Sequence, residues 1–312
     1  MTNDVNLSLN GRYKIQQVIS KSSISIVSIA IDEKSNNVVA IKSIDRNLMG
    51  QKNAMKYVET ELRLLQRVKH SSFPKVYDIL YTQKYIHIIM EYLENGSLIE
   101  LLEHGSILLY QDKVNICRKV LEGINYMHQR GICHRDIKPD NICLNSNNEP
   151  KIIDFGLSKE IFQEVSDTMC GTFLYAAPEV IKSQNYCGFK ADVWSFGVTM
   201  HLIFTNKYPF EFADDAKYVS NVRNGKLVIR NLCTGVIGEI INDCLEINPE
   251  LRKNSSELLL KFPKNYCGSI PISSSAARKV VVHTGSNITI HKNIITPLVE
   301  KKMNVNFRRV SY

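Results

Sequence analysis

The stretch from His134 to Asn141 constrains this 312-residue chain more than any other part of it. It reads His-Arg-Asp-Ile-Lys-Pro-Asp-Asn, and Asp-Phe-Gly follows at residues 154–156. The Asp136 carboxylate can orient an attacking hydroxyl and accept its proton, while Asn141 and Asp154 offer the oxygen ligands that hard metal ions prefer. A base and two oxygen ligands in this order are what phosphoryl transfer from a magnesium nucleotide requires. Chance is the alternative explanation, but two such motifs in the right order are rare.

These motifs resemble those of the protein kinase family, and the resemblance extends over about residues 13–262. It implies an α+β, bilobal protein kinase fold, with a small β-rich N-lobe that carries one key helix and a larger, mainly helical C-lobe. The chain is long enough for two lobes and a tail. The expected boundaries are an N-terminal extension (1–12), the N-lobe (13–90), a hinge (91–96), the C-lobe (97–262) and a basic, mostly disordered tail (263–312).

Two charged residues of the expected N-lobe fit this resemblance. Lys42 ends the β-branched run that starts at Val38, which predicts a buried strand presenting an ammonium group at its end. Residues 52–68 show helical spacing of the apolar residues Met55, Val58, Leu62, Leu65 and Val68. Glu61 lies on this helix. The resemblance implies that Lys42 pairs with Glu61 and binds the α- and β-phosphates of ATP, although such charges taken alone usually lie on the surface.

The chain departs from the family at the expected glycine-rich loop. Serine stands at all three glycine positions, as Ser20, Ser22 and Ser25, between Ile19 and Val27. Glycine lets the backbone approach the phosphates and adopt unusual φ/ψ angles. We therefore expect a stiffer loop that is further from the nucleotide, with strain of ~1 kcal/mol per affected position. The expected consequence is a raised KM for ATP.

Further residues around the nucleotide follow from the resemblance. Apolar side chains are expected to enclose the adenine, the backbone after the strand at residues 86–90 is expected to hydrogen-bond it, and Mg²⁺ is expected with the ATP. The implied ATP-binding set is Ile19, Val27, Ala40, Lys42, Glu61, Met90, Glu91, Leu93 and Cys143, and the implied metal ligands are Asn141 and Asp154.

The acceptor and its regulation are also predicted. Lys138 and Thr172 match the serine/threonine type of kinase, in the calcium/calmodulin-dependent kinase-like group; Lys138 neutralises charge on the migrating phosphoryl group, and Thr172 belongs to the substrate platform. Thr168 stands at the spacing of an activating phosphosite, with Arg135 and Lys159 placed to receive the phosphate. The expected partners are protein substrates with Ser or Thr and an upstream activating kinase.

Other patterns concern packing and substrate choice. Asp192 is expected to accept hydrogen bonds from the catalytic-loop backbone, and Glu179 to pair with Arg252. Three positions that often carry arginine-reading acids hold Ser97, Asp140 and Leu202, of which only one is acidic. Strong selectivity for dibasic substrates is therefore not expected.

Composition limits the remaining function classes. The eight cysteines have no C-x-x-C or metal-ligand spacing, which indicates reduced thiols in the cytoplasm, with the nucleus as the alternative. No apolar run has the length of a membrane span, so no membrane association is expected. The net charge of +8 comes without a Lys/Arg run, so nucleic acid is not an expected partner. No calcium-loop motif is present, so no intrinsic calcium sensor is expected.

Two hypotheses about function stay open. Retention of Lys42, Glu61, Asp136, Asn141 and Asp154 favours an active serine/threonine kinase. The serine loop favours a pseudokinase scaffold that binds nucleotide weakly and transfers nothing. A small-molecule kinase of related fold lacks support, because Thr172 and residues 177–179 resemble a platform for protein substrates.

Overall fold

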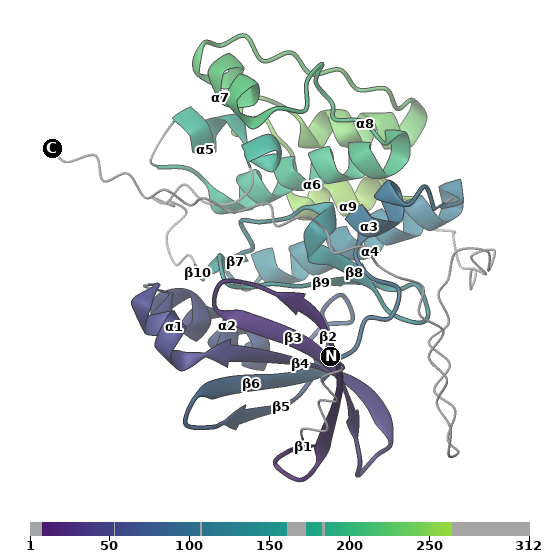
Figure 1. The fold of residues 1–312 in the computed structure, drawn as a ribbon. Coiled ribbons are helices and arrows are strands. Elements are labelled where there is room, and N and C mark those ends of the chain that lie inside the picture. Colours follow the sequence, from purple (N-terminus) through teal and green to yellow (C-terminus); the bar gives the residue numbers. More distant parts are fainter. Residues whose placement is uncertain (1–7, 53, 107, 161–172, 183–184, 264–312) are drawn as a thin grey trace, which may run out of the picture. The chain divides into compact units, whose positions relative to one another are not determined.

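The computed structural model describes residues 8–52, 54–106, 108–160, 173–182 and 185–263 (Figure 1). All of these lie in the first of two units, residues 1–276. Within them, the N-lobe is an antiparallel sheet with the strand order β1-β2-β3-β4-β6-β5. Its strands are β1 (Ser8–Leu9), β2 (Tyr13–Lys21), β3 (Ser25–Asp32), β4 (Asn37–Asp45), β5 (Val76–Tyr81) and β6 (Tyr85–Glu91).

The central strands form because they are rich in β-branched residues that pack well on a pleated surface. In β4, Ile41 is fully buried, and in β6 both Ile88 and Ile89 are fully buried. The sheet begins earlier than expected, since Ser8 and Leu9 of the predicted N-terminal extension pair with the start of β2.

Two helices, rather than the one expected, pack on this sheet: α1 (Arg46–Gln51) and α2 (Met55–Arg67). The Asp45 side chain begins α1 by accepting the N–H groups of Asn47 and Leu48. Helix α2 is the amphipathic helix predicted over 52–68, and it buries Val58, Glu61 and Leu64. Met55, in the first turn of this helix, is 46% exposed.

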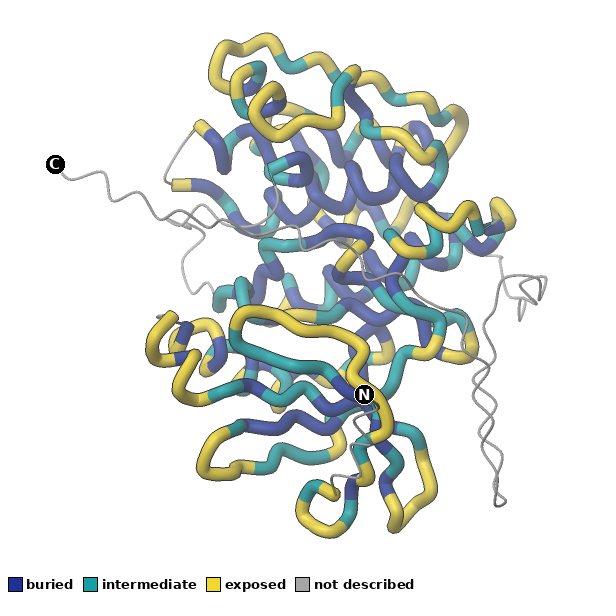
Figure 2. The backbone as a smooth tube through the Cα atoms, viewed as in Figure 1, coloured by how far each residue is buried: buried dark blue, intermediate teal, exposed yellow. Residues whose placement is uncertain are grey.

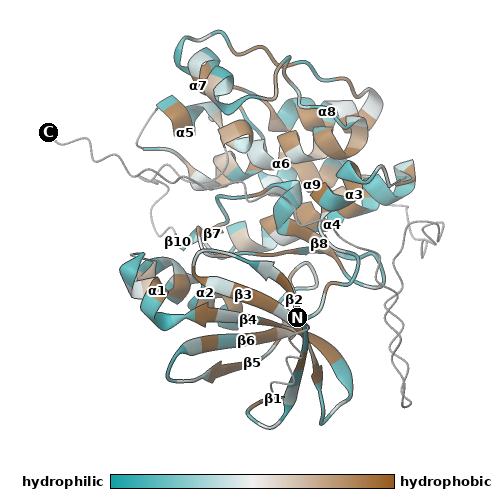
Figure 3. Cartoon of the chain, viewed as in Figure 1, coloured by the Kyte–Doolittle hydropathy of each residue, from teal (hydrophilic) through white to brown (hydrophobic). Residues whose placement is uncertain are grey.

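The C-lobe is mainly helical and surrounds α6, which is buried along nearly its whole length (Figure 2). Figure 3 shows that α6 is also predominantly apolar, as a helix enclosed on all sides must be. Residues 112–130 carry apolar side chains every three to four positions, which predicts a helix, and they form most of α4, whose periodic apolar residues are all buried. The C-lobe elements are α3 (Leu98–Glu103), α4 (Tyr110–His128), β7 (Ile132–Cys133), η1 (Pro139–Asn141), β8 (Ile142–Leu144), β9 (Pro150–Ile152), β10 (Lys159–Glu160), η2 (Phe173–Tyr175), α5 (Pro178–Lys182), α6 (Gly188–Thr205), α7 (Asp215–Arg223), α8 (Gly235–Cys244) and α9 (Ser255–Lys261).

The α+β, bilobal fold inferred from the sequence is therefore confirmed. None of the helices in the described part of the chain combines the length and apolarity that a bilayer crossing demands. Residues 264–312, the predicted tail, lie outside the described residues.

Candidate active site

Asp136 lies in the loop between β7 and η1, where two side chains approach the same carboxylate oxygen. Its Oδ2 accepts a hydrogen bond from Asn141 Nδ2 at 2.8 Å and lies 2.8 Å from Lys138 Nζ. Asn141 Nδ2 also donates to the Asp136 backbone carbonyl at 2.9 Å. The loop thus brings the predicted base, the predicted phosphoryl-neutralising lysine and one predicted metal ligand into direct contact.

The buried Asp192 of α6 holds this loop in place through hydrogen bonds. Its carboxylate accepts the backbone N–H groups of His134 and Arg135, each at 2.7 Å, and the side chain of His128 at 3.0 Å. Arg135 has a φ of 67°, a left-handed conformation that costs a non-glycine residue about 1 kcal/mol. These hydrogen bonds offset that cost, and they satisfy a carboxylate that is 1% exposed.

Asp154 follows β9, and its backbone is left-handed as well, with a φ of 67°. Its Oδ1 accepts the Gly156 N–H at 3.1 Å. The neighbouring Phe155 is buried, with its ring 5.5 Å from that of Phe73 and 5.7 Å from that of His134. This packing fixes the turn that carries Asp154.

The donor set fits a magnesium ion. Both hydrogen bonds of the Asn141 side-chain amide come from Nδ2, which leaves the carbonyl oxygen Oδ1 as its metal-binding atom. Asp154 adds carboxylate oxygens. Oxygen donors from one or two side chains, with nucleotide phosphates completing the shell, are what Mg²⁺ ordinarily accepts.

Lys42 on β4 and Glu61 on α2 form an ion pair, with 2.5 Å between Nζ and Oε1. Burial disfavours the charged amine, but the negative charges of Glu61 and Asp154 outweigh this effect and raise the pKa of Lys42. Desolvation in the site would likewise raise the pKa of Asp154, but the positive charge of Lys42, the Gly156 N–H and the charges of His134 and Lys138 together lower it. Lys42 and Asp154 therefore stay oppositely charged across the site at neutral pH.

The other predicted nucleotide residues lie on five strands, β2, β3, β4, β6 and β8, and in the connection that follows β6. Ala40 is buried on β4 and pairs in register with Met90 on β6, while Val27 on β3 pairs with Lys42. Ile19 on β2 is 46% exposed. Glu91 ends β6, and Leu93 lies in the following connection. Cys143 is on β8, where burial raises the pKa of its thiol to about 12.

The serine loop differs from its expected form. Ser20, Ser22 and Ser25 are all absent from the residues with positive φ in the described chain, so the predicted backbone strain is wrong. Ser22 and Ser25 instead close the β2–β3 hairpin, with 2.9 Å between their hydroxyls. Ser22 Oγ also accepts the backbone N–H of Ser25 at 3.0 Å and, more weakly, that of Ile24 at 3.4 Å. The hydroxyl therefore satisfies two backbone donors at the tip of the hairpin.

Sequence reasoning missed one ion-pair cluster. Arg63 and Arg67 of α2 both pair with Glu160 of β10, which lies 97 and 93 residues away along the chain. The only local signal is the spacing of the two arginines, which places them on one face of α2. Nothing local points to Glu160 as their partner.

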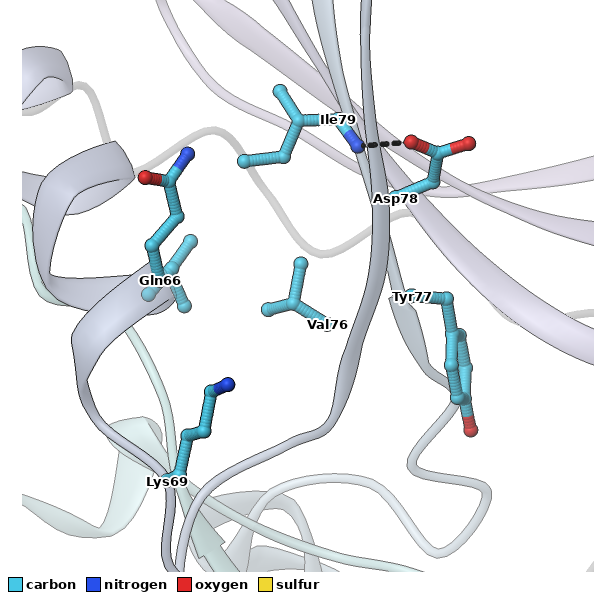
Figure 4. Close-up of a pocket in the computed structure, with 7 residues that line it drawn as sticks. Gln66, Lys69, Val76, Tyr77, Asp78 and Ile79 are labelled. Atoms are coloured by element: carbon cyan, nitrogen blue, oxygen red, sulfur yellow. Dashed lines mark hydrogen bonds between the residues drawn. The ribbon is translucent and has the colours of Figure 1, made fainter.

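The described part of the chain also contains a cavity of about 310 Å³, which is lined by residues other than the predicted site residues. Figure 4 shows it between α2 and the edge strand β5, where Asp78 Oδ1 accepts the N–H of Ile79 at 2.8 Å. It is lined by Leu65, Gln66, Lys69, Val76, Tyr77, Asp78 and Ile79. None of these residues belongs to the predicted nucleotide or metal set.

The structure describes some of the residues predicted to support or bind the substrate, but not all of them. Arg252 forms the expected pair with Glu179, with Nη1–Oε1 and Nη2–Oε2 distances of 2.6 and 3.0 Å. Of the three positions considered for arginine reading, Ser97 and Leu202 are buried and Asp140 is exposed. Thr168 and Thr172 lie outside the described residues.

A model of the family described as the protein kinase domain matches residues 13–269. The serine/threonine-protein kinase cds1 of Schizosaccharomyces pombe is 33% identical over 265 residues, which cover 80% of this chain and 58% of that protein. CBL-interacting serine/threonine-protein kinase 8 of Arabidopsis thaliana is 29% identical over 250 residues, which cover 80% of this chain and 56% of that protein. A probable serine/threonine-protein kinase of Dictyostelium discoideum is 30% identical, and 30% of that protein is covered.

The chain thus spans less than two thirds of the length of these curated relatives. The family match nevertheless covers both lobes and every predicted site residue. It coincides with the part of the chain in which Lys42, Asp136 and Asp154 lie around one site. The chain therefore belongs to the protein kinase family.

Proposed function

We propose that the protein is a serine/threonine protein kinase, which transfers the γ-phosphoryl group of ATP to a serine or threonine hydroxyl of a protein substrate. The observation that carries this proposal is the convergence of charges on Asp154. The charges of Lys42 and Lys138 both act on this carboxylate, and Lys138 also pairs with Asp136. Phosphate binding and proton acceptance are thereby combined in one site.

Each residue has a defined part in the proposed reaction. Lys42, held by Glu61, binds nucleotide phosphates through its permanently charged ammonium group. Asp136 orients the substrate hydroxyl and accepts its proton as the new bond to phosphorus forms and the bond from the γ-phosphorus to the bridging oxygen breaks, which releases ADP. Lys138 neutralises negative charge on the phosphoryl group during its transfer to the substrate hydroxyl. A bound Mg²⁺, held by Asn141 and Asp154, would neutralise charge on the phosphates of the nucleotide.

The test compares wild-type protein with Asp136→Asn and Asp154→Asn in a radiolabelled ATP transfer assay on a generic basic protein. Both variants should lower kcat by at least about a hundredfold, because each removes a group that acts at the reacting atoms. Asp243→Asn, which removes a carboxylate on α8, serves as the control. Wild-type turnover in both site variants would refute the proposal.

The pseudokinase hypothesis retains one supporting observation, because Ser22 Oγ accepts backbone donors at the tip of the loop. A scaffold of this kind would bind ADP or ATP weakly and give no transfer to any substrate. Calorimetric titration with ADP, run beside the transfer assay, separates the two readings. Binding without transfer favours the scaffold, and binding with transfer favours the enzyme.

We also propose that an upstream kinase activates the protein by phosphorylating Thr168, which lies four residues before Thr172. Arg135 and Lys159 support the proposal, since Arg135 Nε donates to the Leu157 carbonyl at 2.6 Å and both belong to segments that meet through β7 and β10. Phosphate there would gain charge-assisted hydrogen bonds. Thr168→Ala should lower activity, and an unphosphorylated but fully active protein would contradict this mode of regulation.

The exposure of Asp140, together with the burial of Ser97 and Leu202, supports substrates without a strong dibasic requirement. A peptide library with arginine at varied upstream positions tests this. Preference for a single upstream arginine is the expected result, and a strict need for two would contradict it.

A further inference from the structure

Three charged side chains from two separate elements meet beside the active site. Arg63 and Arg67 on α2 each donate to a different oxygen of Glu160, with Arg63 on Oε2 and Arg67 on Oε1. Figure 1 shows β10, which carries Glu160, next to the helix pair α1 and α2. Both carboxylate oxygens are therefore used to join the C-lobe to this helix.

The burial of the three groups distinguishes this cluster from an ordinary surface ion pair. The Glu160 side chain is only 9% exposed, whereas those of Arg63 and Arg67 are 51% and 56% exposed. An isolated exposed pair contributes little, because water and salt screen it. Here two guanidinium groups compensate one largely desolvated carboxylate, and removing either side leaves unbalanced charge in the same place.

Each end of the cluster is linked to the catalytic residues. On the C-lobe side, Glu160 pairs in register with Ile132 of β7, and β7 runs directly into His134. Cys133 Sγ adds a contact to the Lys159 carbonyl at 3.4 Å. Glu160 is thus fixed to the strand that begins the catalytic loop.

On the N-lobe side, α2 carries Glu61, which pairs with Lys42 at 2.5 Å. Arg63 and Arg67 follow Glu61 on the same helix by two and six residues. A rotation or outward shift of α2 would therefore break the Glu160 contacts and the Lys42 contact together. Leu64, which is fully buried, and the Tyr126 hydroxyl, which accepts the Lys69 N–H at 3.1 Å, also hold the end of this helix. The ion pairs and these contacts together hold α2 in position.

We infer that Glu160 is a positioning residue, which anchors α2 to the catalytic-loop strand through Arg63 and Arg67 and so keeps Glu61 on Lys42. The contacts are made by unmodified side chains, so this anchoring needs no phosphate. It acts separately from the proposed phosphorylation of Thr168. The activity readout of this inference rests on the proposed kinase function, whereas its structural readout does not.

The test uses Glu160→Gln and the double variant Arg63→Gln/Arg67→Gln in the full chain. Each should reduce kcat/KM for ATP about five- to twentyfold, because the two charge-assisted contacts no longer favour the inward position of α2. Combining all three substitutions should cause no further loss, because the residues act as one unit. Hydrogen exchange of the α2 amides, Met55–Arg67, should become about tenfold faster in the same variants.

Glu122→Gln is the matched control, because it breaks the Arg118–Glu122 pair, an exposed contact on α4 with an Nε–Oε1 distance of 3.1 Å. It should change neither readout. If Glu160→Gln lowers the melting temperature, the charge-exchanged variant Glu160→Arg/Arg63→Glu/Arg67→Glu should restore both readouts, and failure to restore them overturns the inference.

Two further results would also overturn it. One is an α2 exchange rate in Glu160→Gln within twofold of wild type. The other is a loss of kcat/KM in the triple variant equal to the product of the separate losses. If the wild-type protein transfers no phosphate, the proposed function fails, while the exchange measurement still decides the role of Glu160.

Discussion

Substitution of Ser22 tests how the serine loop affects nucleotide affinity. In the free protein, Ser22 Oγ accepts the Ser25 N–H at 3.0 Å and the Ile24 N–H at 3.4 Å. A phosphate bound beneath the hairpin needs such backbone donors and must first displace the hydroxyl. We therefore expect Ser22→Ala, which keeps the Cβ atom and removes the hydroxyl, to tighten the binding of phosphate-bearing nucleotides.

The magnitude follows from the hydrogen bonds lost. One good neutral hydrogen bond contributes a net 0.5–1.5 kcal/mol, and the contact at 3.4 Å contributes much less. A release of about 1 kcal/mol corresponds to about fivefold tighter binding. Ser22→Gly should have a similar effect, since the three serines already adopt ordinary backbone angles and glycine relieves no strain.

The assay is calorimetric titration with ADP and, in parallel, with adenosine. Adenosine lacks phosphates, so Ser22→Ala should tighten ADP binding and leave adenosine binding unchanged. Ser23→Ala is the matched control, because Ser23 is an exposed serine at the same hairpin tip without a hydrogen bond in the described structure. An unchanged Kd for ADP, or an equal change for ADP and adenosine, would refute the competition between hydroxyl and phosphate. Tighter binding with glycine but not with alanine would show that backbone approach limits affinity instead.

Three further predictions concern the groups around the site. Asp192→Asn should lower the free energy of unfolding by about 2–4 kcal/mol in urea titrations, because an amide cannot accept all the donors that meet this buried carboxylate; an unchanged midpoint would contradict this. Lys42→Met should cost the most stability near neutral pH. Because the pKa of Asp154 is lowered, the contribution of this carboxylate to stability is complete above the ordinary pKa of an aspartate and is lost as the pH falls through the lowered one. Because the pKa of Lys42 is raised, the contribution of its ammonium group is lost only at strongly alkaline pH. A difference between wild type and variant that stays constant from pH 7 to pH 2 would refute the coupling. Burial raises the pKa of Cys143 to about 12, so iodoacetamide should alkylate it at pH 8 about a thousandfold more slowly than an ordinary thiol, as peptide mass spectrometry can measure, and equal rates would disprove this environment.

The amino-acid sequence by itself determined the features that depend on residues close together in the chain. The segments 134–141 and 154–156 indicate the site because their functional groups are carried on two short loops. The periodicity of α4 predicted its buried face, since apolar residues three to four apart share one side of a helix. Lys42 and Glu61 could be paired only because the family resemblance supplied their contact.

Only the tertiary structure decided which charged side chains from distant segments form ion pairs and which groups a rotatable hydroxyl binds. Glu160 pairs with Arg63 and Arg67 because β10, which pairs with β7, lies beside α2, a contact that no local pattern encodes. The serine loop looked strained from its composition, but a folded hairpin let Ser22 satisfy the backbone donors with its own side chain. Local periodicity and motif chemistry are properties of neighbouring residues, whereas ion-pair partners and hydrogen-bond acceptors are selected by the packing of distant segments.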